Sequence, residues 1–365
     1  MDKLSGKELK SLVQKQMGIC VSIYMPTIRK GAETQQNQIR YKNLLREAEY
    51  QLNASELRPS EVKFMLEPAQ ELSGNTPFWR NQGDGLVVFL SPDSFKYYRV
   101  SQSFKELIVV ADRFHVKPLI PALAADMEFY ILAISQKNIR VLHCSLQNAE
   151  EVNLEGIPEN LAEALNLDDF EKRLQRHTGT EDMKTNILQY FKQVDRGLHE
   201  FLRDKKAPLI FAGVDYLLPI YKEVNTYPYL VDSGISGNPE GSNADMLLDS
   251  ARPVVETILK TKRIDALSRY RQDAGTGLTS SNVKEIVRAA CHGRVGILFV
   301  TVGVQQWGKF NATTDEITLE KDAGPANEDL LDLAAIQTMM NGGTVYALDQ
   351  EEMPRDSSLA AIFRY

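Results

Sequence analysis

A polar loop before a long amphipathic helix is the first candidate binding site in the sequence. An apolar stripe with helical spacing begins near residue 181 and continues to about residue 202. Free backbone N–H groups at a helix N-terminus attract anions such as phosphate. We therefore predict an anion-binding loop, with a plain capped helix start as the alternative. The loop consists of Arg176, His177, Thr178, Gly179 and Thr180.

The same loop keeps one enzymatic interpretation open. His177 precedes the carboxylates Glu181 and Asp182, and such a group would supply acid–base catalysis to a hydrolase. Elsewhere the sequence offers no catalytic set. It has no Walker A loop, and its five histidines are scattered without cysteine or histidine partners at metal-ligand spacing. We therefore expect no metal and no cofactor, and we assign no catalytic residue.

A second candidate site lies on a helix that the apolar spacing predicts from about residue 37 to residue 52. Asn37, Arg40, Lys42 and Arg46 lie in this helix and are candidate RNA contacts. Residues 1–123 carry a balance of +4, although the whole chain has a formal charge of −7. A contact with a polyanion is therefore expected to be local and to use this first third. A solvated helix face is the alternative.

The composition is that of an ordinary globular protein of 365 residues, long enough for two or three domains. No apolar stretch approaches the roughly 20 residues that span a bilayer, and the first residues lack the apolar core of a signal peptide. These observations predict a cytoplasmic protein without membrane contact. The three cysteines are widely separated and each adjoins an apolar run, so we expect buried thiols rather than disulfides.

Short apolar strands alternate with helices along most of the chain, which predicts an α/β protein with an α+β first domain. Two β-rich runs around residues 135–138 predict a hairpin at the start of a second domain. A Gly-rich stretch at residues 275–277 marks the next boundary, and residues 104–123 are interpreted as a connector. The predicted domains are 1–123, 124–278 and 279–365.

The order of these elements resembles that of archaeal and eukaryotic class-1 peptide-chain release factors and Pelota, and more closely that of the bacterial branch of this superfamily. The first third contains a Val-Ser-Ile-Tyr-Met-Pro strand at 21–26 and a Gly-Leu-Val-Val-Phe strand at 85–89 that are similar to strands of those factors. Their stop-codon-reading Asn-Ile-Lys-Ser segment corresponds to residues 37–40. The ending Ala-Ile-Phe-Arg-Tyr at 361–365 is the most specific signal.

The resemblance implies a three-domain release-factor-like architecture. Its central domain would have an RNase H-like fold without nuclease activity, and its last domain would resemble kink-turn-binding ribosomal proteins. In release factors, the loop before the long central helix carries Gly-Gly-Gln, which assists hydrolysis of peptidyl-tRNA. The corresponding residues 177–180 hold one glycine and no glutamine, so the resemblance implies a factor without that activity.

The resulting hypothesis is a ribosome- or tRNA-associated factor in translation termination, rescue or quality control. Its loop 176–180 would approach a tRNA end or another anion, and its first domain would contact RNA. Enzymatic activity stays open, with a non-enzymatic factor favoured. The alternatives are a ribosome-independent RNA or peptidyl-tRNA hydrolase and a non-catalytic scaffold that binds proteins through its C-terminal domain.

Overall fold

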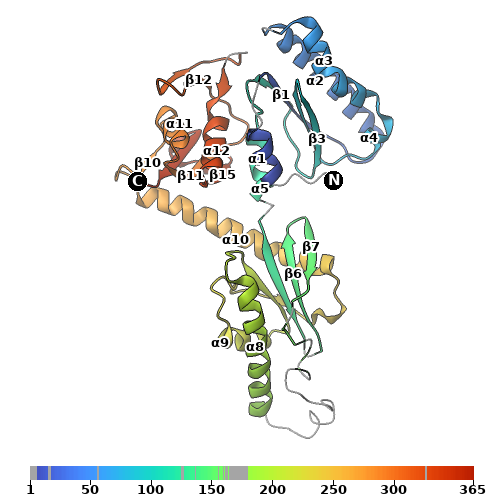
Figure 1. Cartoon of the computed structure of the whole chain (residues 1–365), viewed down its shortest axis with the longest axis vertical. Coiled ribbons are helices and arrows are strands. Elements are labelled where there is room, and N and C mark those ends of the chain that lie inside the picture. The colour runs from blue at the N-terminus through green and yellow to red at the C-terminus, as the bar shows by residue number, and fades with distance from the viewer. Residues whose placement is uncertain are drawn as a thin grey trace. The chain divides into compact units, whose positions relative to one another are not determined.

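The computed structural model of the chain describes residues 6–14, 18–55, 57–124, 127–135, 137–154, 156–158, 160, 163, 180–324 and 327–365. The chain forms two compact units (Figure 1). Unit 1 combines Met1–Leu123, called here the N-terminal module, with Arg263–Tyr365, called the C-terminal module. Unit 2 is Ala124–Lys262. The predicted α/β class is confirmed, while the three predicted domain boundaries stay a prediction.

The N-terminal module is built on an antiparallel sheet with strand order β3-β2-β1-β4. Its strands are β1 (Cys20–Pro26), β2 (Gly85–Ser91), β3 (Ser94–Val100) and β4 (Leu107–Ala111). Its helices are α1 (Gly6–Gln14), η1 (Ala32–Thr34), α2 (Gln35–Asn53), α3 (Pro59–Gly74), α4 (Thr76–Arg80), η2 (Lys117–Leu119) and α5 (Ile120–Ala124). Period-2 alternation along β1 sends Val21, Ile23 and Met25 into the core with α2, α3 and α4, and Tyr24 into a second core with α1.

The core under α2 and α3 is anchored by Trp79 of α4. Its ring packs against Tyr41 with centroids 5.2 Å apart, and its indole N–H donates to the Leu72 carbonyl at 3.0 Å. The buried indole ring is therefore packed against other side chains, and its N–H group has a hydrogen-bond partner. This packing fixes α2 on the sheet and leaves the opposite face of α2 to solvent.

The C-terminal module contains a sheet with order β10-β16-β11-β15, in which only β11 and β15 are parallel. α11 and α12 cover one face, and the end of α10 packs Ala266 and Tyr270 on the other. A smaller sheet, β13-β12-β14, pairs Trp307 with Asp329. The elements are α10 (Ala244–Gln272), β10 (Thr279–Ser280), α11 (Val283–Cys291), β11 (Val295–Thr301), β12 (Trp307–Asn311), β13 (Glu316–Leu319), β14 (Glu328–Asp329), α12 (Leu330–Met340), β15 (Thr344–Leu348), η4 (Gln350–Glu352), η5 (Pro354–Asp356) and β16 (Leu359–Phe363).

Unit 2 holds a five-stranded sheet with order β7-β6-β5-β8-β9. The first three strands form an antiparallel meander, and β5, β8 and β9 are parallel because helices cross between them. α8 and α9 pack on one face and the first part of α10 on the other. The elements are β5 (Phe129–Ile134), β6 (Ile139–Ser145), β7 (Asn148–Val152), α8 (Thr180–Leu202), β8 (Leu209–Gly213), α9 (Leu217–Val224), β9 (Ile235–Ser236) and η3 (Pro239–Gly241).

One feature of the structure differs from the sequence-based expectations. Residues 104–123 contain the strand β4 and the short helix η2 rather than a plain connector. β4 is an edge strand with three half-exposed side chains, although its run Leu-Ile-Val-Val-Ala is as continuously apolar as that of β2. The three cysteines are free thiols, as expected. Cys20 and Cys144 are buried, which raises the pKa of each to about 12, whereas Cys291 is half-buried.

None of the described helices is both long and apolar enough to cross a bilayer. Among the described residues, no group of histidine, cysteine and acidic side chains is arranged to hold a metal ion.

Candidate functional site

The solvent face of α2 is the most distinctive surface among the sequence-predicted sites. The buried side of this helix carries Tyr41, Leu44, Leu45, Ala48 and Leu52. Residues spaced by three or four positions share one face of a helix, so the opposite side presents a second stripe. We call this stripe the α2 outer face; it consists of Ile39, Lys42, Asn43, Arg46 and Tyr50.

The α2 outer face combines positive charge with exposed apolar side chains, and the exposed Glu47 and Glu49 lie on either side of it. Ile39 is 60% exposed and Tyr50 is 73% exposed. Lys42 and Arg46 are exposed and lie between them along the helix. Basic groups next to an exposed aromatic ring are the features with which proteins bind the backbone and stack the bases of single-stranded nucleic acid.

Asn37, by contrast, is fully buried at the start of α2. Its amide N–H donates to the carbonyl of Ile28 at 2.9 Å, and its amide oxygen accepts from the backbone N–H of Ile28 at 2.9 Å. Both polar functions of the side chain are thus used to hold the segment after β1 against the helix. Asn37 braces the first turn of α2.

Arg40 is half-buried and has partners within the module. Its Nε lies 2.7 Å from a carboxylate oxygen of Glu106, and its Nη1 donates to the Pro26 carbonyl at 3.2 Å. The side chain is 27% exposed. These contacts fix the guanidinium and offset part of its charge, which distinguishes it from Lys42 and Arg46.

A hollow of about 290 Å³ opens beside the first turns of α2. Two primary amides, an aliphatic side chain and the Arg40–Glu106 ion pair meet there. Primary amides both donate and accept hydrogen bonds, which suits a flat polar ligand such as a nucleobase. The lining residues are Gln36, Ile39, Arg40, Asn43 and Glu106.

The second predicted site falls largely outside the described residues. This applies to Arg176, His177, Thr178 and Gly179, while Thr180 begins α8. The structure therefore gives no geometry for the anion loop.

Sequence reasoning selected the basic residues of α2 but missed Gln36, Ile39, Asn43, Tyr50 and Glu106. For Ile39 and Tyr50 a signal was available, because they lie outside the apolar stripe that defines the buried face. Two large apolar side chains on the polar side of an amphipathic helix are a sign of an interaction surface. Glu106 had no such signal, since its pairing with Arg40 depends on the fold.

Comparison with known proteins gives a family match for the middle of the chain. Residues 128–294 match bacterial archaeo-eukaryotic release factor family 3. This segment is therefore similar to the bacterial branch of the archaeo-eukaryotic release factors. The predicted resemblance is thereby confirmed. The family 3 segment covers nearly all of unit 2 and the first elements of the C-terminal module, and it does not include α2.

Solved structures also resemble the chain at low identity. An archaeal translation termination factor, aRF1, is 16% identical, with 99% of each chain covered and a TM-score of 0.26. Archaeal Pelota, in a model of ribosome-bound Pelota and ABCE1, is 15% identical, with 77% of each chain covered and a TM-score of 0.41. Dom34 of S. cerevisiae is 11% identical, with 74% of this chain and 73% of that chain covered and a TM-score of 0.38. No curated protein sequence matches the chain.

Proposed function

We propose that this chain is a ribosome-associated factor in translation termination, rescue or quality control, and that it contacts RNA through the α2 outer face. The family 3 segment supports the translational role. The observation that carries the RNA contact is the exposed stripe of Ile39, Lys42, Asn43, Arg46 and Tyr50, which joins two cations to two exposed apolar groups. Arg40 and Asn37 act as supports that fix the start of the helix.

The charge distribution supports a local contact of this kind. The N-terminal module is the one third of the chain with a positive balance, while the whole chain carries −7. Phosphate contacts by lysine and arginine release counterions, so the binding they produce weakens with salt. In the proposed contact, the affinity comes mainly from the basic side chains on phosphates. The amide and apolar side chains would determine how the RNA is positioned.

The first test is co-sedimentation with ribosomes, measured from low to moderate salt. Lys42→Glu/Arg46→Glu is expected to lower the affinity by roughly tenfold or more and to reduce the salt slope by about one unit per lost cation. The matched control is Lys63→Glu/Arg80→Glu, which makes the same charge change at exposed positions of α3 and α4. Equal loss in both variants would mean that net charge, rather than the α2 outer face, governs binding.

We also propose that the factor works without hydrolysis of the Gly-Gly-Gln type. The loop before α8 reads His177-Thr178-Gly179-Thr180, so it lacks a side-chain amide to position a water molecule. The expected result is no release of peptide from ribosome-bound peptidyl-tRNA above the uncatalysed rate. Release that depends on His177, shown by its loss in His177→Ala, would favour the hydrolase alternative instead.

A tRNA end at loop 176–180 and a protein partner at the C-terminal module remain predictions that belong to this proposal. Co-purification that returns protein partners but no RNA would favour the scaffold alternative.

A further inference from the structure

The ion pair in the hollow beside α2 is open to a ligand. Arg40 and Glu106 line the hollow, and the Glu106 side chain is 50% exposed. Arg40 uses its Nε on Glu106 Oε1 and its Nη1 on the Pro26 carbonyl. Among the described residues, Arg40 Nη2 and Glu106 Oε2 take part in no hydrogen bond. The pair therefore presents donor N–H groups beside carboxylate oxygens that can still accept.

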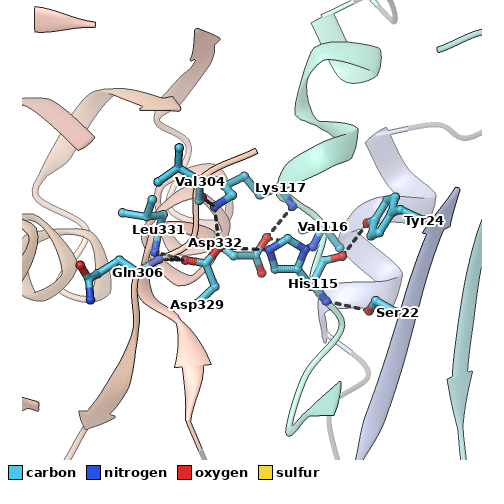
Figure 2. A network of polar contacts seen from close by, with 10 residues as sticks. All are labelled: Ser22, Tyr24, His115, Val116, Lys117, Val304, Gln306, Asp329, Leu331 and Asp332. Carbon is cyan, nitrogen blue, oxygen red and sulfur yellow. Dashed lines mark hydrogen bonds and ion pairs between the residues drawn. The ribbon is translucent and has the colours of Figure 1, made fainter. Parts of the chain in front are cut away.

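The ion pairs that dock the two modules of unit 1 are closed by comparison. In this cluster, Asp329 receives Lys117 Nζ at 2.5 Å and His115 Nε2 at 3.1 Å, and Asp332 accepts from the Lys117 backbone N–H at 2.5 Å (Figure 2). His115, Lys117, Asp329 and Asp332 are each at most 3% exposed. Buried charges need such partners from within the protein, and no ligand reaches them. The exposure of Glu106 therefore marks the α2 hollow, rather than this cluster, as a place for a ligand.

The amides around the Arg40–Glu106 pair are available as well. Gln36 and Asn43 are exposed, and neither amide makes a hydrogen bond within the described part of the chain. Gln36, Ile39, Arg40 and Asn43 are spaced i, i+3, i+4 and i+7, so they share one face of α2. Glu106 meets this face from the residue before β4. The hollow therefore offers the apolar surface of Ile39 bordered by four polar side chains, which suits a flat polar ring.

The donors and acceptors of the ion pair distinguish among the common bases. A carboxylate has two oxygens that only accept, and a guanidinium has N–H groups that only donate. Along its pairing edge, guanine presents two adjacent donors, N2–H and N1–H, and then the acceptor O6. Adenine, cytosine and uracil lack two adjacent donors, so each would place a ring-nitrogen lone pair or a carbonyl oxygen against the carboxylate. Glu106 and Arg40 together offer the complement of guanine.

We propose that the hollow beside α2 binds a guanine base, with Glu106 accepting from N1–H and N2–H and Arg40 donating to O6. This inference rests on the proposed function and names the base that the α2 site selects. Lys42 and Arg46 lie next to the hollow on the same helix, so they are placed to contact the phosphates attached to that base. The same chemistry binds guanine in RNA or in a free nucleotide.

The test is the binding of short, fluorescently labelled single-stranded RNAs to the unmodified protein, measured by fluorescence anisotropy. The RNAs are uridine-rich and differ at one central position, which is guanosine, inosine or adenosine. Inosine keeps N1–H and O6 and lacks the N2 amino group. We expect the guanosine RNA to bind about fivefold or more tightly than the inosine RNA, and about tenfold or more tightly than the adenosine RNA.

Competition experiments identify the source of the base. Displacement of the labelled RNA by unlabelled guanosine monophosphate would identify a free nucleotide as a ligand, whereas displacement by unlabelled guanosine RNA alone would identify RNA. Equal affinity for the three RNAs, or no binding of either the guanosine RNA or the nucleotide, would overturn the proposal.

Two glutamate variants separate Glu106 from the overall charge of the module. Glu106→Gln replaces one acceptor with a donor and should bring the guanosine-to-inosine ratio of affinities to about one. Glu71→Gln at an exposed position of α3 removes the same charge and should keep the ratio of the unmodified protein. A guanosine preference that persists in Glu106→Gln would contradict the role assigned to Glu106.

The variant Lys42→Glu/Arg46→Glu distinguishes this inference from the proposed function. It should weaken the binding of the three RNAs by similar factors, because phosphate contacts do not depend on the base. Absence of a guanine preference, with ribosome binding that still depends on Lys42 and Arg46, would refute the guanine site alone. Ribosome binding that does not depend on these two residues would refute the proposed RNA contact instead.

Discussion

Lys117 is the residue on which the docking of the two modules depends most directly. It is fully buried, and its Nζ contacts both Asp329 and the Val304 carbonyl. His115 and the other partners pull the pKa of Asp329 below its ordinary value despite burial, so this carboxyl is an anion in the folded protein. Removing the cation would leave that anion with only His115 as a side-chain partner.

Lys117→Met is therefore expected to lower the free energy of unfolding of unit 1 by about 3 kcal/mol or more. Urea denaturation followed by circular dichroism measures this change. The control Lys309→Met replaces an exposed lysine of β12 and should stay within about 0.5 kcal/mol of the unmodified protein. Equal stability of Lys117→Met and the unmodified protein would contradict the role assigned to the ion pair.

At this scale the sequence revealed neither local nor distant side-chain partners. Asn37 was predicted to contact RNA, and its hydrogen bonds to Ile28, only nine residues away, were not anticipated. The His115–Asp329 contact joins residues 214 positions apart, and no periodicity or motif in the sequence relates them. Such a contact becomes visible only when the fold brings two modules together.

Among the elements, α2 was predicted nearly to its ends because the burial of one face decides its structure. The expected helix over 37–52 corresponds to Gln35–Asn53, and its apolar spacing matches the buried positions. β4 was missed because its apolar run at 107–111 was grouped with the Pro-containing apolar stretch that follows it, and its pairing with β1 depends on the fold. The anion loop before α8 stays a prediction.

Tyr50→Ala tests whether the exposed ring of α2 has a binding role. Because the side chain is 73% exposed, stability should change by less than about 0.5 kcal/mol. Stacking of a base on an aromatic ring is worth about 1–3 kcal/mol, so ribosome affinity should fall roughly fivefold or more. Tyr50→Phe keeps the ring and should retain the affinity. Equal affinity of all three proteins in co-sedimentation would remove Tyr50 from the interface.

At the scale of the whole molecule, the order of the two units along the chain determines which segments fold together. Unit 2 is inserted between the two modules of unit 1, so residues 1–123 and 263–365 are joined by the cluster around Asp329 as well as by packing. The sequence correctly predicted the α/β class and the resemblance of the middle segment to bacterial archaeo-eukaryotic release factors. It did not reveal that the first and last thirds form one unit, although α12 is buried on nearly every side and contributes Ile336 to the N-terminal core.

The chain contains only two tryptophans, and the fold assigns one to each module of unit 1. Trp79 is buried in the core of the N-terminal module. Trp307 of β12 is half-buried and pairs with Asp329 of β14. Intrinsic fluorescence can therefore follow the two modules separately. Emission from Trp79 reports whether the N-terminal core is folded, and emission from Trp307 reports whether water reaches β12. A red shift of Trp307 emission with unchanged Trp79 emission would show that the two modules separate while the N-terminal core stays folded. The measurement needs no added dye.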